Sequence, residues 1–170
     1  MSLVGLKFQH DLFISYRHTA NASNWVDVFH KRLLVHLEDR VERGKVAVWR
    51  DTADIRAGDE WRKEIEAALD ATAIFLAIIT PPYFDSTVCA KELDHFLALS
   101  KDPKESVQRV IVPVYKLPRR ANLEPPELEG FHHYAFHHLD PPHKEFAPDR
   151  DIEEERCFYE QLVCLVADLE

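Results

Sequence analysis

Glycine is scarce in this sequence, and its four glycines are scattered. They are Gly5, Gly44, Gly58 and Gly130 in a chain of 170 residues. A GxGxxG dinucleotide-binding turn and a phosphate-binding P-loop both need closely spaced glycines, because the backbone there approaches a phosphate group. The glycine pattern therefore excludes a Rossmann dehydrogenase and a P-loop nucleotide hydrolase.

Cysteine pairs and long apolar runs are also lacking. Cys89, Cys157 and Cys164 form no Cys-x-x-Cys pair, so we expect reduced, mostly buried thiols rather than a zinc or redox site. No apolar run reaches the ~18 to 20 residues that span a bilayer. The N-terminus also lacks the basic segment followed by an apolar segment that is typical of a signal peptide. We therefore expect a soluble, cytoplasmic protein without a membrane partner. Residues 1–7 read as a lead segment that is in part an expression scar.

Positive charge is in deficit, mainly in the C-terminal part. The chain has 21 Lys and Arg against 30 Asp and Glu, a formal net charge of -9. From residue 121 onward, 13 acidic residues oppose three basic ones, whereas the first 120 residues are nearly neutral. This balance argues against a nucleic acid held by phosphate contacts. We expect the acidic part to be a solvated face, which leaves the basic residues of the first part to line a site for an anionic ligand.

Short apolar runs alternate with helical patterns along a chain of single-domain size. The pattern predicts strands at 11–16, 46–49, 74–80, 110–115 and 133–136. It also predicts four helices: one capped by Asn24, one near Trp61, one capped by Asp85 or Ser86, and one that begins at Ile152. The run 74–80 is apolar on both faces, as a covered central strand requires. This alternation predicts an α/β domain with a parallel sheet.

The ligand site of such a sheet lies outside the carboxyl ends of its strands. The third strand ends at Thr80. A phosphoacceptor receiver domain needs an aspartate at that position, so the sequence excludes this class of protein. The histidines at 132, 133, 137 and 138 do not suggest a metal site, because the outer ones are ~13 to 20 Å apart in an extended strand. The helix after Ser86 carries Glu92 at the boundary of its apolar stripe. From the residue pattern alone, Glu92 is either a local hydrogen-bonding residue or a catalytic carboxylate.

Three ordered segments resemble the signature segments of a Toll/interleukin-1 receptor (TIR) domain, closest to the bacterial type. They are FISYR at 13–17, WRDTADIRAGDEW at 49–61 and STVCAKEL at 86–93. The likeness covers residues 8–140, and the family also expects the closing helix at about 152–169. The resemblance implies a single domain over residues 8–170 with a flavodoxin-like, five-stranded parallel sheet of order 2-1-3-4-5 and helices on both faces.

The resemblance also implies an activity that many TIR domains have. They are NAD⁺ glycohydrolases that release nicotinamide and give ADP-ribose or a cyclic ADP-ribose, in immune or defence signalling. The catalytic glutamate of the family falls on Glu92, NAD⁺ is the substrate, and no other cofactor or metal is implied. Self-association through the loop from Asp51 to Glu60 is expected to activate the enzyme. Two alternatives stay open: a non-enzymatic module that binds another TIR domain through the same loop, and another nucleotide-binding doubly wound domain.

The family's pocket predicts which residues surround the substrate. They are Tyr16, Arg17, Trp49, Asp51 and Cys89. Trp49 offers an aromatic face and Arg17 a partner for the pyrophosphate, although strand-end packing and a solvated loop charge are the competing interpretations. Many active members have a tryptophan four residues before the glutamate, where this chain has Val88. Either Trp49 or Tyr83 then supplies the stacking face, or the enzyme is weakened, while Trp61 is expected in the helix core.

One carboxylate is enough for this chemistry. Cleavage of the bond between nicotinamide and ribose develops positive charge on the sugar, as in glycoside hydrolysis. Nicotinamide leaves as a neutral molecule, so it needs no proton from a second acid. A single glutamate can then hold the ribose hydroxyls and stabilise the developing charge.

Overall fold

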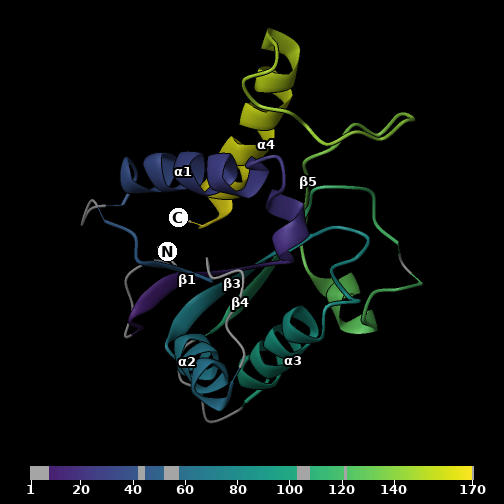
Figure 1. The fold of residues 1–170 in the computed structure, drawn as a ribbon. Coiled ribbons are helices and arrows are strands. Elements are labelled where there is room, and N and C mark those ends of the chain that lie inside the picture. The colour runs from purple at the N-terminus through teal and green to yellow at the C-terminus, as the bar shows by residue number, and fades with distance from the viewer. Residues whose placement is uncertain (1–7, 42–44, 52–57, 103–107, 121, 170) are drawn as a thin grey trace.

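The fold is a parallel sheet between two layers of helices (Figure 1). The computed structural model describes residues 8–169, except 42–44, 52–57, 103–107 and 121. The strands are β1 (His10–Tyr16), β2 (Val48–Arg50), β3 (Thr72–Ile79), β4 (Val110–Tyr115) and β5 (Tyr134–Ala135). Their order is β2-β1-β3-β4-β5, and every neighbouring pair is parallel. This confirms the predicted fold class and strand order.

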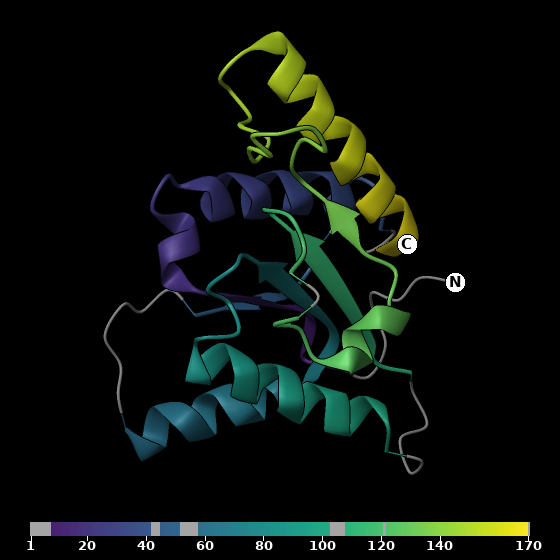
Figure 2. The ribbon, with the colours of Figure 1, turned by 90° about the vertical axis from the view of Figure 1, so that its right-hand side faces the viewer.

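Helices cover both faces of the sheet. Helices α1 (Trp25–Glu38) and α4 (Ile152–Leu169) lie on one face, and α2 (Asp59–Asp70) and α3 (Thr87–Ser100) lie side by side on the other (Figures 1 and 2). Two short 3-10 helices, His18–Asn21 and Pro126–Gly130, complete the elements of the described residues. All eight residues of β3 are buried, as its two-sided apolar pattern predicts.

The alternation of side chains along β1 divides the core in two. Leu12 and Ile14 belong to the core under α1 and α4, whereas Phe13 belongs to the core under α2 and α3. Two residues further on, Ser15 therefore points toward α3, and Tyr16 packs against the α1 and α4 core. This alternation decides which residues of FISYR can meet Glu92.

Some local expectations are wrong. Asn24 has a left-handed backbone with φ 57° and makes no side-chain cap, so Asn21 Oδ1 accepts hydrogen bonds from the first amides of α1, Val26 N and Asp27 N. Of the three cysteines only Cys89 is buried, because the other two lie on α4 outside its buried stripe. Ser86, one of the two expected caps, does cap α3, accepting from Cys89 N at 3.3 Å.

The described helices include none that is both long and apolar enough to cross a membrane. Gly58 precedes α2 with φ 151°, a conformation that strains any residue with a side chain.

Arg109 ties the end of α2 to the start of β3. Its guanidinium donates through Nη1 to Leu69 O at 3.1 Å and Thr72 O at 2.6 Å, and through Nη2 to Asp70 O at 2.8 Å. Arg109 is buried, so these carbonyls have little access to water as an alternative partner. This arrangement sets where α2 lies relative to the sheet, and with it one side of the site described below.

We expect Arg109→Lys to lower the free energy of unfolding by about 2 kcal/mol, because an ammonium group cannot reproduce the planar fork of donors. Urea unfolding followed by circular dichroism measures this. The matched control is Arg156→Lys, which changes an exposed guanidinium on α4 and should cost less than about 0.5 kcal/mol. Equal losses in the two variants would contradict the role given to Arg109.

Candidate active site

Glu92 lies in the second turn of α3, facing the end of β1. Its Oε2 accepts a hydrogen bond from Ser15 Oγ at 2.6 Å, and the same Oγ lies 2.8 Å from the Tyr83 hydroxyl. A serine hydroxyl has a single hydrogen. When Ser15 donates it to Glu92, the Tyr83 hydroxyl donates to Ser15, which gives a chain of hydrogen bonds from Tyr83 through Ser15 to the carboxylate.

Glu92 is more buried than its place on the helix predicts. The sequence puts it at the boundary between the buried and solvent faces of α3, yet only 6% of its surface is exposed. The reason is that its carboxyl group turns toward Ser15 of β1, and α2 also packs against α3. The carboxylate thus lies among protein atoms on nearly all sides.

Burial changes the acidity of this carboxyl group. Desolvation raises the pKa of Glu92 to about 7, with a further increase from the charge of Asp51, while the hydrogen bond from Ser15 opposes the rise. The group therefore changes charge near neutral pH. A carboxyl group with such a pKa at the carboxyl edge of a parallel sheet is a candidate catalytic residue.

The two other groups next to Glu92 stay uncharged. Burial raises the pKa of the Cys89 thiol to about 11, so it is not a thiolate nucleophile at neutral pH. Burial also raises the pKa of Tyr83 well above its usual range. Tyr83 is fully buried, so its ring presents no open face for stacking. Both residues support the geometry of Glu92 by packing and hydrogen bonding.

The other predicted site residues differ in how closely they approach the carboxyl group of Glu92. Arg17 Nη1 donates to Pro82 O at 2.9 Å, and its charge is close enough to act on the Cys89 thiol. Asp51 directly follows β2 and acts electrostatically on Glu92, while its carbonyl accepts from the Tyr16 hydroxyl at 2.9 Å. Tyr16 reaches this edge only by its hydroxyl, since its ring packs on the α1 face of the sheet.

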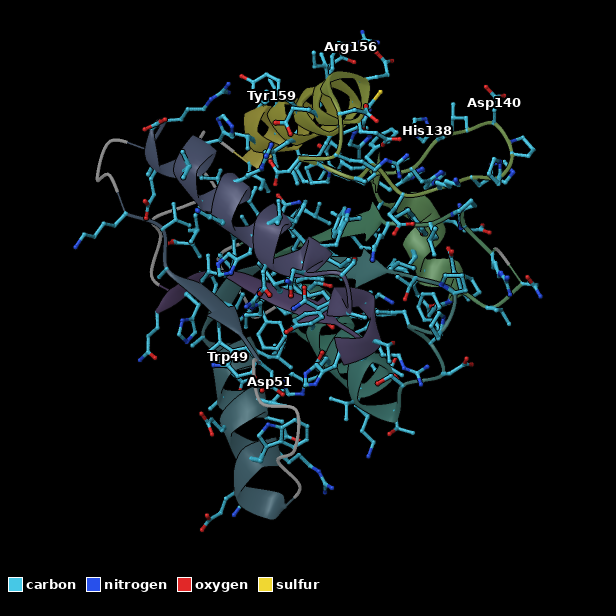
Figure 3. All side chains as sticks on the ribbon, turned by 45° about the horizontal axis from the view of Figure 1, so that its top comes forward. Trp49, Asp51, His138, Asp140, Arg156 and Tyr159 are labelled. Atoms are coloured by element: carbon cyan, nitrogen blue, oxygen red, sulfur yellow. The ribbon has the colours of Figure 1, made fainter. Side chains whose placement is uncertain are left out.

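Trp49 is occupied by the core on one side. Its ring stacks on Phe13, with centroids 4.5 Å apart and planes at 15°. Figure 3 shows Trp49 and Asp51 at the end of β2 on the α2 side, whereas Tyr159 and Arg156 lie on α4 at the opposite side. The acidic part of the chain on α4 is thus remote from Glu92. Residues 52–57, most of the predicted self-association loop, lie outside the described residues.

Two residues at this edge were not singled out from the sequence. Ser15 is the hydrogen-bond donor to Glu92, and the available signal was a polar residue inside a buried strand. Arg50 pairs through Nη2 with Asp27 Oδ1 at 2.7 Å. Its Nε and Nη1 are buried without a hydrogen-bond acceptor among the residues that the structure describes. The available signal was a charged residue directly after the apolar run at 46–49.

A groove of about 480 Å³ runs along the seam between α2 and α3 and reaches Glu92. Its volume is in the range of small-molecule sites. Its walls include Trp61, Ile65 and Leu69 of α2 and Val88, Lys91 and Glu92 of α3. Trp61 packs against the core under α2 and α3, as expected from the sequence, but it is only half-buried.

We expect Glu92→Gln to stabilise the protein at high pH. The folded pKa of about 7 exceeds the ordinary 4.5, so the folded state holds a proton that the unfolded state releases between these values. The wild type therefore loses stability as the pH rises from the lower to the higher of these pKa values. The substitution removes this loss because the glutamine amide has no proton to release. The amide oxygen still accepts the hydrogen bond from Ser15. Between pH 5 and pH 8 the variant should gain about 2 kcal/mol over the wild type in urea unfolding. The exposed Glu127→Gln gives the baseline, and a gain that is independent of pH would contradict the burial of an ionisable carboxyl group.

Comparison with known proteins adds the family to this geometry. The family model of the TIR domain matches residues 12–147. No curated protein sequence matches the chain closely enough to count as a relative. Among solved structures, the TIR domain of the Toll-related receptor TRR-2 from Hydra magnipapillata is similar, with a TM-score of 0.53 at 15% identity over 94% of this chain and 99% of that one.

A second similar structure has a lower score. It is that of the TIR domains of the activated Roq1 resistosome, which directly recognises the pathogen effector XopQ, with a TM-score of 0.46 at 18% identity over 94% of this chain and 75% of that one. The receptor domain supports the fold, and the family model covers all three signature segments. The chain belongs to the TIR domain family.

Proposed function

We propose that this TIR domain is an NAD⁺ nucleosidase in which Glu92 is the catalytic residue. The observation that carries the proposal is a nearly buried carboxyl group with a pKa of about 7, held by Ser15 and adjoining a groove of ligand size. Such a group is costly to keep in a folded protein, and carboxyl groups of this kind occur at sites where charge develops during a reaction. The family resemblance supplies the substrate.

The proposed reaction adds water to NAD⁺ and gives nicotinamide, ADP-ribose and a proton. The bond between C1′ of the ribose and the pyridinium nitrogen breaks, and its electron pair leaves with nicotinamide, which becomes neutral. Ionised Glu92 stabilises the positive charge that develops at C1′. Water then forms the new bond to C1′, and its proton passes to Glu92 and from there to solvent. If a nucleophilic atom of the adenine half attacks instead, the product is a cyclic ADP-ribose.

Other residues at the edge have supporting roles in the proposal. Arg17 lies near the thiol beside Glu92 and is the cation proposed for the pyrophosphate. Asp51 and Trp49 form the β2 side of the substrate site. Self-association through the loop from Asp51 to Glu60 is proposed to complete the site and to activate the enzyme, in immune or defence signalling.

A non-enzymatic interaction module is the second candidate. The observation that favours it is the burial of Glu92, whose carboxyl group has a hydrogen-bond partner and 6% of its surface exposed. A carboxyl group in that state can serve packing alone. This function would use TIR–TIR contacts through the same loop and would consume no NAD⁺.

We expect nicotinamide release from NAD⁺ to fall at least about 100-fold in Glu92→Gln, because the variant keeps the hydrogen bond from Ser15 but cannot carry negative charge. Chromatographic separation of the products at several protein concentrations, including protein crowded on a surface, measures the rate and distinguishes linear from cyclic products. A rate that rises faster than linearly with protein concentration supports activation by self-association. The exposed Glu127→Gln is the control. Wild-type protein that releases no nicotinamide even when crowded points to the interaction module.

The acidic limb of the activity profile reports on Glu92. Activity needs the ionised carboxylate, so kcat/KM should rise with pH through about 7 in the wild type. Ser15→Ala removes a hydrogen bond that lowers this pKa, and we expect the limb to move to higher pH. Circular dichroism checks that the variant is folded. If the acidic limb lies at the same pH in Ser15→Ala as in the wild type, Glu92 is not the group whose ionisation controls the observed activity.

A further inference from the structure

The groove between α2 and α3 places an aromatic ring opposite the end of α3 that carries Glu92. Trp61 stands on the α2 wall, and Val88 and Glu92 lie one helical turn apart on the α3 wall. Side chains at i and i+4 lie on the same face of a helix. Trp61, Val88 and Glu92 therefore border one space.

Of the other two aromatic residues considered for stacking, Tyr83 has no open face and Trp49 has one face covered. Tyr83 is fully buried, and one face of Trp49 is covered by Phe13 at a centroid distance of 4.5 Å. Neither residue lines the groove. A small side chain at position 88 leaves room beside Trp61 that a tryptophan at that position would fill, and Trp61 is the tryptophan of the lining.

Charges of both signs surround the groove. Glu92 lies in the wall and is negative when ionised, and the exposed residues of the lining carry positive charge on Arg62 and Lys91 and negative charge on Glu66 and Asp94. A ligand that has both a flat cationic ring and a phosphate group can use both kinds of charge. The ring would lie on Trp61, which favours a cation through its π face, and the phosphate would pair with Arg62 or Lys91.

We propose that this groove binds the nicotinamide mononucleotide half of NAD⁺, with Trp61 as the stacking residue in place of the tryptophan that many family members have at the position of Val88. The proposal rests on the proposed function for the identity of the ligand. In this proposal the stacking residue lies on α2, whereas the tryptophan of many family members lies on α3. The reacting C1′ then lies next to Glu92, since the ribose is attached to the ring that Trp61 holds.

Two measurements test Trp61. The first is the KM for NAD⁺, which should rise about tenfold in Trp61→Leu and less in Trp61→Phe, with kcat changing less than about twofold, because a stacking contact holds ground state and transition state alike. The second is the fluorescence of the full chain titrated with nicotinamide mononucleotide. A pyridinium ring quenches an indole that it touches, so saturable quenching should occur in the wild type and disappear in Trp61→Phe. Lys63→Ala, on the solvent side of α2, is the matched control for both measurements and should behave as the wild type.

The outcomes separate the two proposals. Hydrolysis that depends on Glu92, together with an unchanged KM in Trp61→Leu and quenching that persists in Trp61→Phe, overturns the role of Trp61 and leaves the nucleosidase standing. Saturable quenching that depends on Trp61 without any hydrolysis supports the binding groove and overturns the nucleosidase. The absence of both hydrolysis and quenching overturns both proposals. Urea unfolding of each variant confirms that the compared proteins are folded.

Discussion

The need to cover both faces of the sheet is the constraint from which the site follows. β3 is buried along its whole length, so helices must lie on either side of it, and each crossover returns the chain to the same end of the sheet. All five strands are therefore parallel, and their carboxyl ends share one edge. The ends of β1 and β2 and the beginning of α3 meet there, which places Ser15, Asp51 and Glu92 within electrostatic reach of one another although they are far apart in sequence.

The helix layer formed by α2 and α3 changes the pKa of Glu92 at this edge of the sheet. A glutamate on α3 alone would face water on one flank, and its pKa would stay near the ordinary value. Because the carboxyl group of Glu92 turns toward Ser15 and α2 packs against α3, Glu92 loses most of its hydration, and the hydrogen bond from Ser15 is its polar compensation among the described residues. Arg109 contributes indirectly, since it fixes the end of α2 to the beginning of β3. The acidity of Glu92 thus depends on packing that lies outside the site.

The sequence predicts the sheet well because its signals are local. The apolar run of β3 and the cap at Ser86 each depend on a few neighbouring residues, and the structure confirms both. The burial of Glu92 was not predictable in the same way, since a single helix pattern contains no information about α2. The capping of α1 by Asn21 instead of Asn24 has the same origin, because the 3-10 turn that brings Asn21 to the helix is set by its surroundings. The strands' order required the family resemblance.

The burial of Glu92 makes ionisation of its carboxyl group costly, but it also strengthens the attraction between the ionised group and a cationic ligand. With a pKa of about 7, Glu92 holds a proton in a substantial fraction of ligand-free molecules at neutral pH. A pyridinium ring or a developing positive charge beside the carboxyl group favours its ionised form, and by linkage the ionised form favours the cation to the same degree. The low polarity that makes ionisation costly also strengthens the attraction once both charges are present. Within the described part of the chain, no cationic side chain neutralises this carboxylate. It is therefore suited to a ligand that brings its own positive charge, as the proposed substrate NAD⁺ does on its nicotinamide ring.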